Sequence, residues 1–152
     1  LDVDIWFYRP ADNVTNLPDS QRDPSNFPHY LDPGTNEFYP GLWDTKLDKI
    51  LKLAAEDKKV ARIFVNPGIK KRLCSLYPNQ EFLKKIRPWF RHHEHFHVRL
   101  TCPIDSPNCK NQEASGSIEC SGADFDWWFS QDFRDEYNRR YGSKSISQSC
   151  DV

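Results

Sequence analysis

Histidine is concentrated in one short stretch of this chain. Four of the five histidines lie within RHHEHFHVRL, residues 91–100, at His92, His93, His95 and His97. Imidazole binds divalent metals and also transfers protons near neutral pH. The HxH spacing of His95 and His97 places both rings on the same face of an extended strand. The stretch therefore indicates a metal site or a catalytic acid/base cluster, and a solvated run of imidazoles is the alternative.

Carboxylates near the start of the chain offer the complementary ligands. The segment LDVDIWF alternates, so that Asp2, Asp4 and Trp6 share one face of a predicted strand. If this strand lies beside the strand of His95 and His97, a carboxylate and an imidazole converge on a divalent cation. Zinc suits such a mixture, and catalytic zinc sites keep a position for water. Zinc lowers the pKa of that water from 15.7 toward about 7, which produces a nucleophile for an amide carbonyl.

Other polar residues of the same stretch are candidates for proton transfer and substrate binding. His92, Glu94 and His95 surround His97 in the sequence, and all three can accept or donate a proton. Arg99 follows on the HxH face and is a candidate contact for an acidic group of a substrate. A surface salt bridge is the alternative role for Arg99.

Two histidines fall outside this pattern. His93 is out of register with the HxH face, and we expect it to be solvated. His29 stands alone in a proline-rich loop, and a structural role suits it better than a ligand role. Neither residue is predicted to bind a metal.

The elements that must position these residues are mixed helices and strands without regular βαβ alternation. Strands are expected at residues 1–8, 60–65 and 94–100. Helices are expected from a cap at residue 44 or 45 to the charged residues 56–59, and at about 67–76, 80–86 and 123–141. A long loop region spans residues 9–41. The pattern predicts an α+β fold, with a small antiparallel sheet that carries the metal site, flanking helices and long loops.

Length and charge restrict the class of protein. The 152 residues suit one domain, residues 1–152, that buries about two thirds of its unfolded surface. The 21 basic and 22 acidic residues leave no basic excess, which argues against a nucleic-acid partner. No apolar run approaches the roughly 20 residues of a membrane span. The chain has no Met, so we expect that an N-terminal segment is missing from it.

The cysteines favour an oxidising compartment. In CPIDSPNC, proline, aspartate and serine form a turn that can bring Cys102 and Cys109 together. The total of five is odd, so one cysteine is left over if two bridges form, and Cys150 near the C-terminus is our candidate. Reduced thiols in a cytosolic protein are the alternative.

Several separated blocks together resemble one protein family. The blocks are LDVDIWF, RIFVNPGIKKRLC, RPWFRHHEHFHVRLTCP followed by SPNC, and DFDWWF. In this order they resemble the penicillin-insensitive murein endopeptidases, which are periplasmic zinc enzymes of bacteria. The resemblance implies hydrolysis of the D-alanyl–meso-diaminopimelate cross-link of peptidoglycan. It also implies that β-lactams do not inhibit, because no serine acyl-enzyme forms.

The resemblance assigns roles to residues of this chain. Asp4 and His97 match zinc ligands, and the third ligand, a histidine, is expected upstream of Leu1. His92 and His95 match residues beside the water and the substrate carbonyl. Glu94, three residues before His97, is a further candidate base, because related D-Ala-D-Ala peptidases carry an acid there. Strand alternation would turn Glu94 away from His97, so the main base stays open among these three residues.

The family pattern also implies a set of disulfides. It pairs Cys74 with Cys120 and Cys102 with Cys109, and it leaves Cys150 for an upstream cysteine. These pairs agree with a periplasmic, secreted peptidase whose partners are peptidoglycan peptide stems. The alternative is a non-catalytic secreted domain of the same fold that binds cell wall or metal without turnover.

Overall fold

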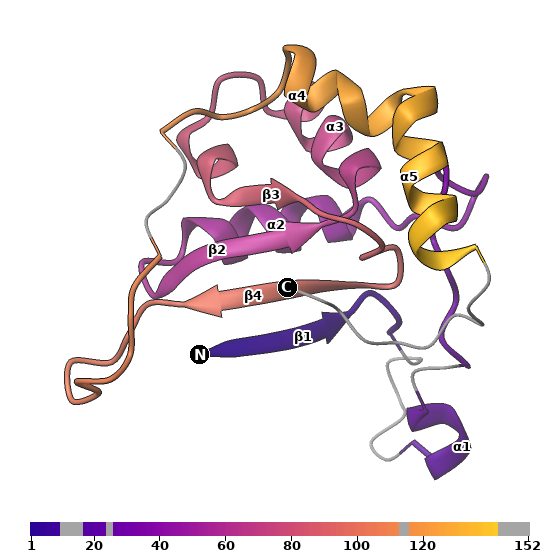
Figure 1. The fold of residues 1–152 in the computed structure, drawn as a ribbon. Coiled ribbons are helices and arrows are strands. Elements are labelled where there is room, and N and C mark those ends of the chain that lie inside the picture. The colour runs from indigo at the N-terminus through magenta and orange to yellow at the C-terminus, as the bar shows by residue number, and fades with distance from the viewer. Residues whose placement is uncertain (10–16, 24–25, 113–115, 143–152) are drawn as a thin grey trace.

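A computed structural model describes residues 1–9, 17–23, 26–112 and 116–142 of the chain. Its centre is a four-stranded sheet in the order β1-β4-β2-β3 (Figure 1). The strands are β1 Asp2–Trp6, β2 Val60–Val65, β3 Ile86–Pro88 and β4 His95–Leu100. Both β1 and β2 pair antiparallel with β4, whereas β3 pairs parallel with β2. The α+β class is confirmed, and β3, which was not predicted, makes the sheet mixed.

Helices α2, Lys46–Glu56, and α3, Pro67–Leu76, cover one face of the sheet (Figure 1). The α3 helix begins where it does because the Asn66 side chain accepts a hydrogen bond from the Gly68 amide and Pro67 occupies the first turn. The core between sheet and helices consists of buried apolar residues from both layers, among them Leu47, Leu51, Ile63, Val65, Ile69, Leu73, Phe96 and Val98. Since Phe96 and Val98 point to the helices, the alternate residues of β4 point to the other face.

Two predicted helices differ in the structure. Residues 80–86 form the short 3₁₀ helix η2, Glu81–Lys84, followed by β3. The region 123–141 divides into α4, Ala123–Asp126, the 3₁₀ helix η3, Trp127–Phe129, and α5, Gln131–Tyr141. The division falls at Ser130, whose backbone is extended and whose hydroxyl accepts a hydrogen bond from the Phe133 amide, which starts a new helix.

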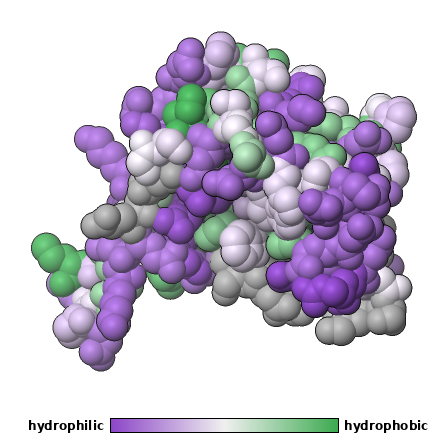
Figure 2. All heavy atoms as spheres, turned by 45° about the horizontal axis from the view of Figure 1, so that its top comes forward, coloured by the Kyte–Doolittle hydropathy of each residue, from purple (hydrophilic) through white to green (hydrophobic). Residues whose placement is uncertain are grey.

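The described residues of the loop regions contain little regular structure. The short helix α1, Asp19–Arg22, lies within the long region between β1 and α2 (Figure 1). Seen with the α4 and α5 end turned forward, the surface is mainly hydrophilic, with apolar groups scattered over it (Figure 2). Among the described residues, no helix combines the length and the apolar character needed to cross a bilayer.

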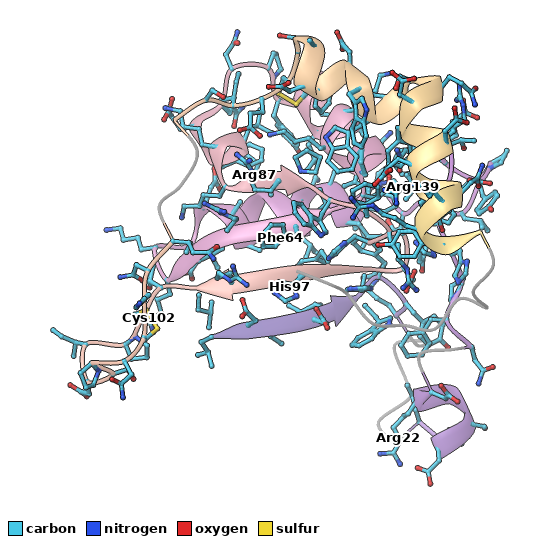
Figure 3. The ribbon with its side chains drawn as sticks, viewed as in Figure 1. Arg22, Phe64, Arg87, His97, Cys102 and Arg139 are labelled. Carbon is cyan, nitrogen blue, oxygen red and sulfur yellow. A yellow bond between two sulfur atoms is a disulfide. The ribbon has the colours of Figure 1, made fainter. Side chains whose placement is uncertain are left out.

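Two disulfides connect separated parts of the chain. Cys74–Cys120 ties α3 to the segment before α4, with an S–S distance of 2.02 Å. Cys102–Cys109 closes a loop that projects from the end of β4 (Figure 3). These are the two pairs that the family resemblance implies. Cys150 lies outside the described residues, so its pairing with an upstream cysteine stays a prediction.

A buried lysine holds the Cys120 segment against η2. Lys70 is fully buried, and its Nζ donates hydrogen bonds to the carbonyl oxygens of Leu83, at 2.7 Å, and Ile118, at 2.5 Å. Burial lowers the pKa of Lys70 from 10.5 to about 7. The folded protein therefore releases this proton at a lower pH than the unfolded chain does.

The stability of the folded state should consequently rise with pH in this range. Between pH 7 and 10.5 the unfolded chain keeps the Lys70 proton while the folded protein loses it, which adds up to about 1.4 kcal/mol per pH unit. We expect the free energy of unfolding to rise by about 2 kcal/mol from pH 7 to 9, relative to the variant Lys70→Met. Urea denaturation of both proteins at the two pH values measures this difference. Parallel changes in the two proteins would contradict the assignment.

Candidate active site

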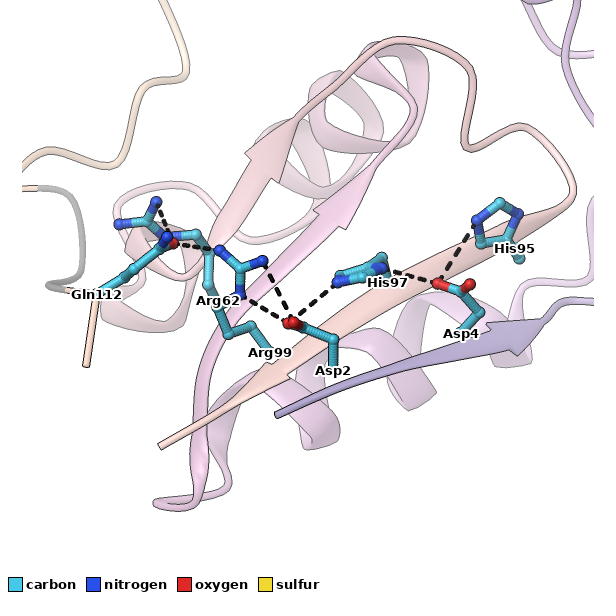
Figure 4. A network of polar contacts seen from close by, with 7 residues as sticks. All are labelled: Asp2, Asp4, Arg62, His95, His97, Arg99 and Gln112. Carbon is cyan, nitrogen blue, oxygen red and sulfur yellow. Dashed lines mark hydrogen bonds and ion pairs between the residues drawn. The ribbon is translucent and has the colours of Figure 1, made fainter. Parts of the chain in front are cut away.

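The register of β1 and β4 brings the predicted ligands together. Asp2 lies opposite Arg99, and Asp4 lies opposite His97. Opposite residues of an antiparallel pair project to the same face of the sheet, here the face away from α2 and α3. His95 precedes His97 on this face, and Figure 4 shows the resulting row of polar side chains. The predicted convergence of Asp4 and His97 is therefore present in the structure.

The His97 ring lies between two carboxylates. Its Nδ1 is 2.8 Å from Asp4 Oδ1, and its Nε2 is 3.2 Å from Asp2 Oδ1 (Figure 4). The Asp2 contact is an ion pair rather than an aligned hydrogen bond. A cation that replaced the proton between Nδ1 and Asp4 would bind the Nδ1 lone pair, and the proton of the neutral ring would then lie on Nε2, facing Asp2.

This arrangement suits a cation between Asp4 and His97. An Nδ1 lone pair and a carboxylate oxygen only 2.8 Å apart repel each other unless a proton or a cation lies between them. A carboxylate oxygen and an imidazole nitrogen are both zinc ligands. The Asp4 side chain is 37% exposed, so the position is open to solvent and to a substrate. Asp4 and His97 could therefore supply two of the ligands of a zinc ion.

Neighbouring positive charge keeps the Asp2 carboxylate ionised beside His97. The Arg99 guanidinium donates to Asp2 Oδ1 at 2.6 Å and lowers the pKa of that carboxyl, with His97 adding to the effect against partial burial. Asp2 is therefore ionised beside the His97 ring. Arg99 also donates to Gln112, so its charge is engaged within this row. A contact between Arg99 and substrate stays a prediction.

His95 stands next to Asp4 on the same face. Its Nε2 is 3.9 Å from Asp4 Oδ1, and its Nδ1 is 3.7 Å from Glu94 Oε1. The ring packs against Trp6, with centroids 5.4 Å apart. His95 is thus almost buried, and one ring nitrogen points toward the Asp4 and His97 pair.

His92 completes the histidine cluster. Its Nδ1 lies 2.8 Å from the Phe90 carbonyl oxygen, which only accepts, so Nδ1 carries the proton. Burial, together with a smaller effect of the nearby His95, lowers the pKa of His92 from 6.5 to about 3, which keeps the ring neutral. Among the described residues, its buried Nε2 has no hydrogen-bond partner. With ring centroids 4.9 Å apart, His92 presents an acceptor nitrogen beside His95.

An unusual backbone turn places His92. Arg91 and His92 both have left-handed conformations, with φ of 61° and 48°, which costs energy for residues other than glycine. Asn66 stabilises this turn with two hydrogen bonds. Its side-chain Nδ2 donates to the Arg91 carbonyl oxygen at 2.9 Å, and its backbone N–H donates to the His92 carbonyl oxygen at 3.2 Å. The residue that caps α3 thus also fixes His92, a function that the sequence did not indicate.

Glu94 precedes β4 and contacts the rings of His93 and His95. Its carboxylate is buried, with Oε2 2.7 Å from His93 Nε2 and Oε1 near His95. Burial alone would raise the pKa of Glu94, but His93 and His95 outweigh it and hold the pKa below its ordinary value. The expectation that His93 is solvated was wrong, since His93 is fully buried. The position of Glu94 thus allows its carboxylate to stabilise a positive charge on the His95 ring.

Aromatic residues lie between the site and a groove on the surface. Phe64 of β2 is the cross-strand partner of His97, on the strand that flanks β4 opposite β1. The two ring centroids are 5.6 Å apart (Figure 3). Trp89 packs edge-on against Phe64, with centroids 5.8 Å apart, and also lines a groove of about 880 Å³ with Trp127 and Trp128. The sequence could not indicate this role for Phe64, because the pairing of β2 with β4 has no local signal.

Comparison with known proteins identifies the family. The family model described as penicillin-insensitive murein endopeptidase matches residues 1–152. A protein of this name from Yersinia enterocolitica is 38% identical over 130 residues, which cover 85% of this chain and 46% of that protein. A protein of the same name from Escherichia coli O1:K1 / APEC is 39% identical over 133 residues, which again cover 85% of this chain and 46% of that protein. The chain thus spans about half the length of these relatives. It belongs to the penicillin-insensitive murein endopeptidase family.

Proposed function

We propose that this chain carries the catalytic site of a zinc-dependent endopeptidase that hydrolyses peptide cross-links of peptidoglycan. The bond cleaved is the one between D-alanine and meso-diaminopimelate. The observation that carries the proposal is the solvent-open pair of Asp4 and His97, with His95 and His92 beside it. Membership of the family supports the reaction and the substrate class.

The residues divide the chemical work among them. When bound, zinc would lower the pKa of a water molecule and polarise the peptide carbonyl. His95 takes a proton from the attacking water at Nε2 and returns it to the leaving amine. Glu94 stabilises the positive charge that His95 gains, because its carboxylate lies 3.7 Å from the other ring nitrogen. His92 Nε2, which has no partner among the described residues, would accept a hydrogen bond from the attacking water.

The surroundings suit a peptide substrate in an extracytoplasmic compartment. Two disulfides are stable in an oxidising environment such as the periplasm. The groove lined by Trp89, Trp127 and Trp128 offers room for a peptide stem beyond Phe64. Arg99 is the predicted contact for an acidic group of that stem. Peptidoglycan peptide stems are thus the proposed partner.

Digestion of purified cross-linked muropeptides by the complete protein tests the proposal. We expect the dimer to yield two monomers that together have gained one water, and we expect 1,10-phenanthroline to abolish and added zinc to restore the cleavage. Penicillin should leave the rate unchanged. If folded, zinc-loaded protein leaves the dimer intact but sediments with sacculi, the non-catalytic wall-binding alternative replaces this proposal.

A further inference from the structure

A second group of possible metal ligands lies on the far side of Glu94 from His95. His29, His93 and Glu94 each offer one ligand atom, and these three atoms all lie within 4.8 Å of one another. His29 comes from the long region between β1 and α2, whereas His93 and Glu94 immediately precede β4. Neither Asp4 nor His97 belongs to this group, so it is separate from the pair described above.

The buried nitrogens of His93 are unusual for a structural histidine. His93 is fully buried, yet neither ring nitrogen makes a hydrogen bond to any described residue. Its Nε2 forms an ion-pair contact of 2.7 Å with Glu94 Oε2, whereas its buried Nδ1 has no hydrogen-bond partner among the described residues. A buried polar group without a partner destabilises the folded state. A buried imidazole nitrogen without a partner, beside a carboxylate and a second imidazole, suits a bound cation.

The third member has a geometry that fits the same cation. The His29 ring meets the His93 ring edge to face, with centroids 4.4 Å apart. Burial lowers the pKa of His29, so its ring is neutral and its lone pair is available near neutral pH. The Glu94 carboxylate is ionised for the reasons given above. A neutral His29 ring and an ionised Glu94 carboxylate are the forms that bind a cation.

We propose that His29, His93 and Glu94 bind a divalent transition-metal ion, with zinc as the best match. Two imidazoles and one carboxylate form a known three-ligand set for zinc. His29 is half-buried, so a fourth position opens toward solvent.

Such an ion would fasten two loops beside the catalytic cluster. The Tyr30 amide already donates to the His93 carbonyl at 3.0 Å, and the Phe7 amide donates to the Glu94 carbonyl at 2.9 Å. The ion would add a link from His29 to the same segment. Because Glu94 would use Oε2 for the metal and keep Oε1 toward His95, the site would also fix the orientation of Glu94. The metal site itself does not depend on the proposed hydrolysis.

Metal binding to variants that lack the first site tests this inference without an activity assay. In the double variant Asp4→Asn, His97→Ala, elemental analysis after gel filtration should find about one zinc per chain. Adding His29→Phe keeps a ring against His93 but removes the ligand nitrogen. We expect this change to weaken zinc binding more than about 100-fold, the upper end for a change outside the ligand shell.

Two outcomes would overturn the inference. One is a metal-free double variant at zinc concentrations that load the wild type, and the other is equal affinity with and without His29→Phe. Circular dichroism and disulfide content verify that the variants are folded. Should a variant not fold, zinc titration of the wild type followed by histidine ring NMR decides the matter. Signals of His29 and His93 must shift with zinc, and unchanged signals would refute the site.

Discussion

Replacing Asp4 with asparagine is expected to lower kcat/KM for cross-linked muropeptides by about 10³-fold or more, because the site loses its metal. The amide oxygen of asparagine is uncharged and is a weaker zinc ligand than the carboxylate. Asp4 is also the carboxylate that contacts His97 Nδ1, at 2.8 Å. Steady-state kinetics and zinc content of the complete protein measure both effects.

Asp2→Asn is the matched control for Asp4→Asn. It makes the same chemical change two residues away on the same face of β1, but Asp2 contacts only the Nε2 side of His97. We expect a loss of about 10- to 100-fold, as for other groups that orient a metal ligand. Equal losses of activity in the two variants, or an Asp4→Asn protein that holds as many zinc ions per chain as the wild type, would contradict the ligand role of Asp4.

Replacing His95 with alanine is expected to lower kcat by about 10²- to 10⁴-fold while the zinc content is unchanged. His95 is the imidazole whose Nε2 points to the Asp4 side of the site and whose Nδ1 lies near Glu94. Its removal takes away the proposed carrier of the proton but none of the proposed ligands. Single-turnover cleavage of a muropeptide dimer, with zinc measured on the same sample, separates the two effects.

His92→Ala serves as the comparison for His95→Ala. The low pKa of His92, about 3, makes its ring an acceptor of hydrogen bonds rather than a carrier of protons near neutral pH. We therefore expect its loss to reduce kcat less than the loss of His95. The reverse order, with both variants folded, would assign the main base to His92.

Much of the site could be predicted because it depends on local patterns. Alternation alone predicted which side chains share a face with Asp4 in one strand and with His97 in the other. Antiparallel pairing of β1 with β4 then brings Asp4 and His97 together. The bounds of β2 and α3 were predicted to the residue, since Asn66 and Pro67 give a strong start signal for a helix. Strand ends and helix caps of this kind depend on only a few neighbouring residues.

The parts that could not be predicted depend on contacts between distant residues. Phe82, Leu83 and Ile86 are all buried, and their spacing suits a helix as well as η2 followed by β3. His93 has no place in the HxH pattern, and its burial results from the approach of the His29 loop. A single sequence does not reveal which loop covers which strand end, because no periodicity encodes it.

The position of zinc in crystals of the metal-loaded protein tests the central claim most directly. Anomalous diffraction at the zinc edge should show a peak between Asp4 and His97, within about 2.0–2.2 Å of Asp4 Oδ1 and His97 Nδ1. A fully loaded protein with no peak at this position, or with zinc bound to the Nε2 side of His97, would contradict the account.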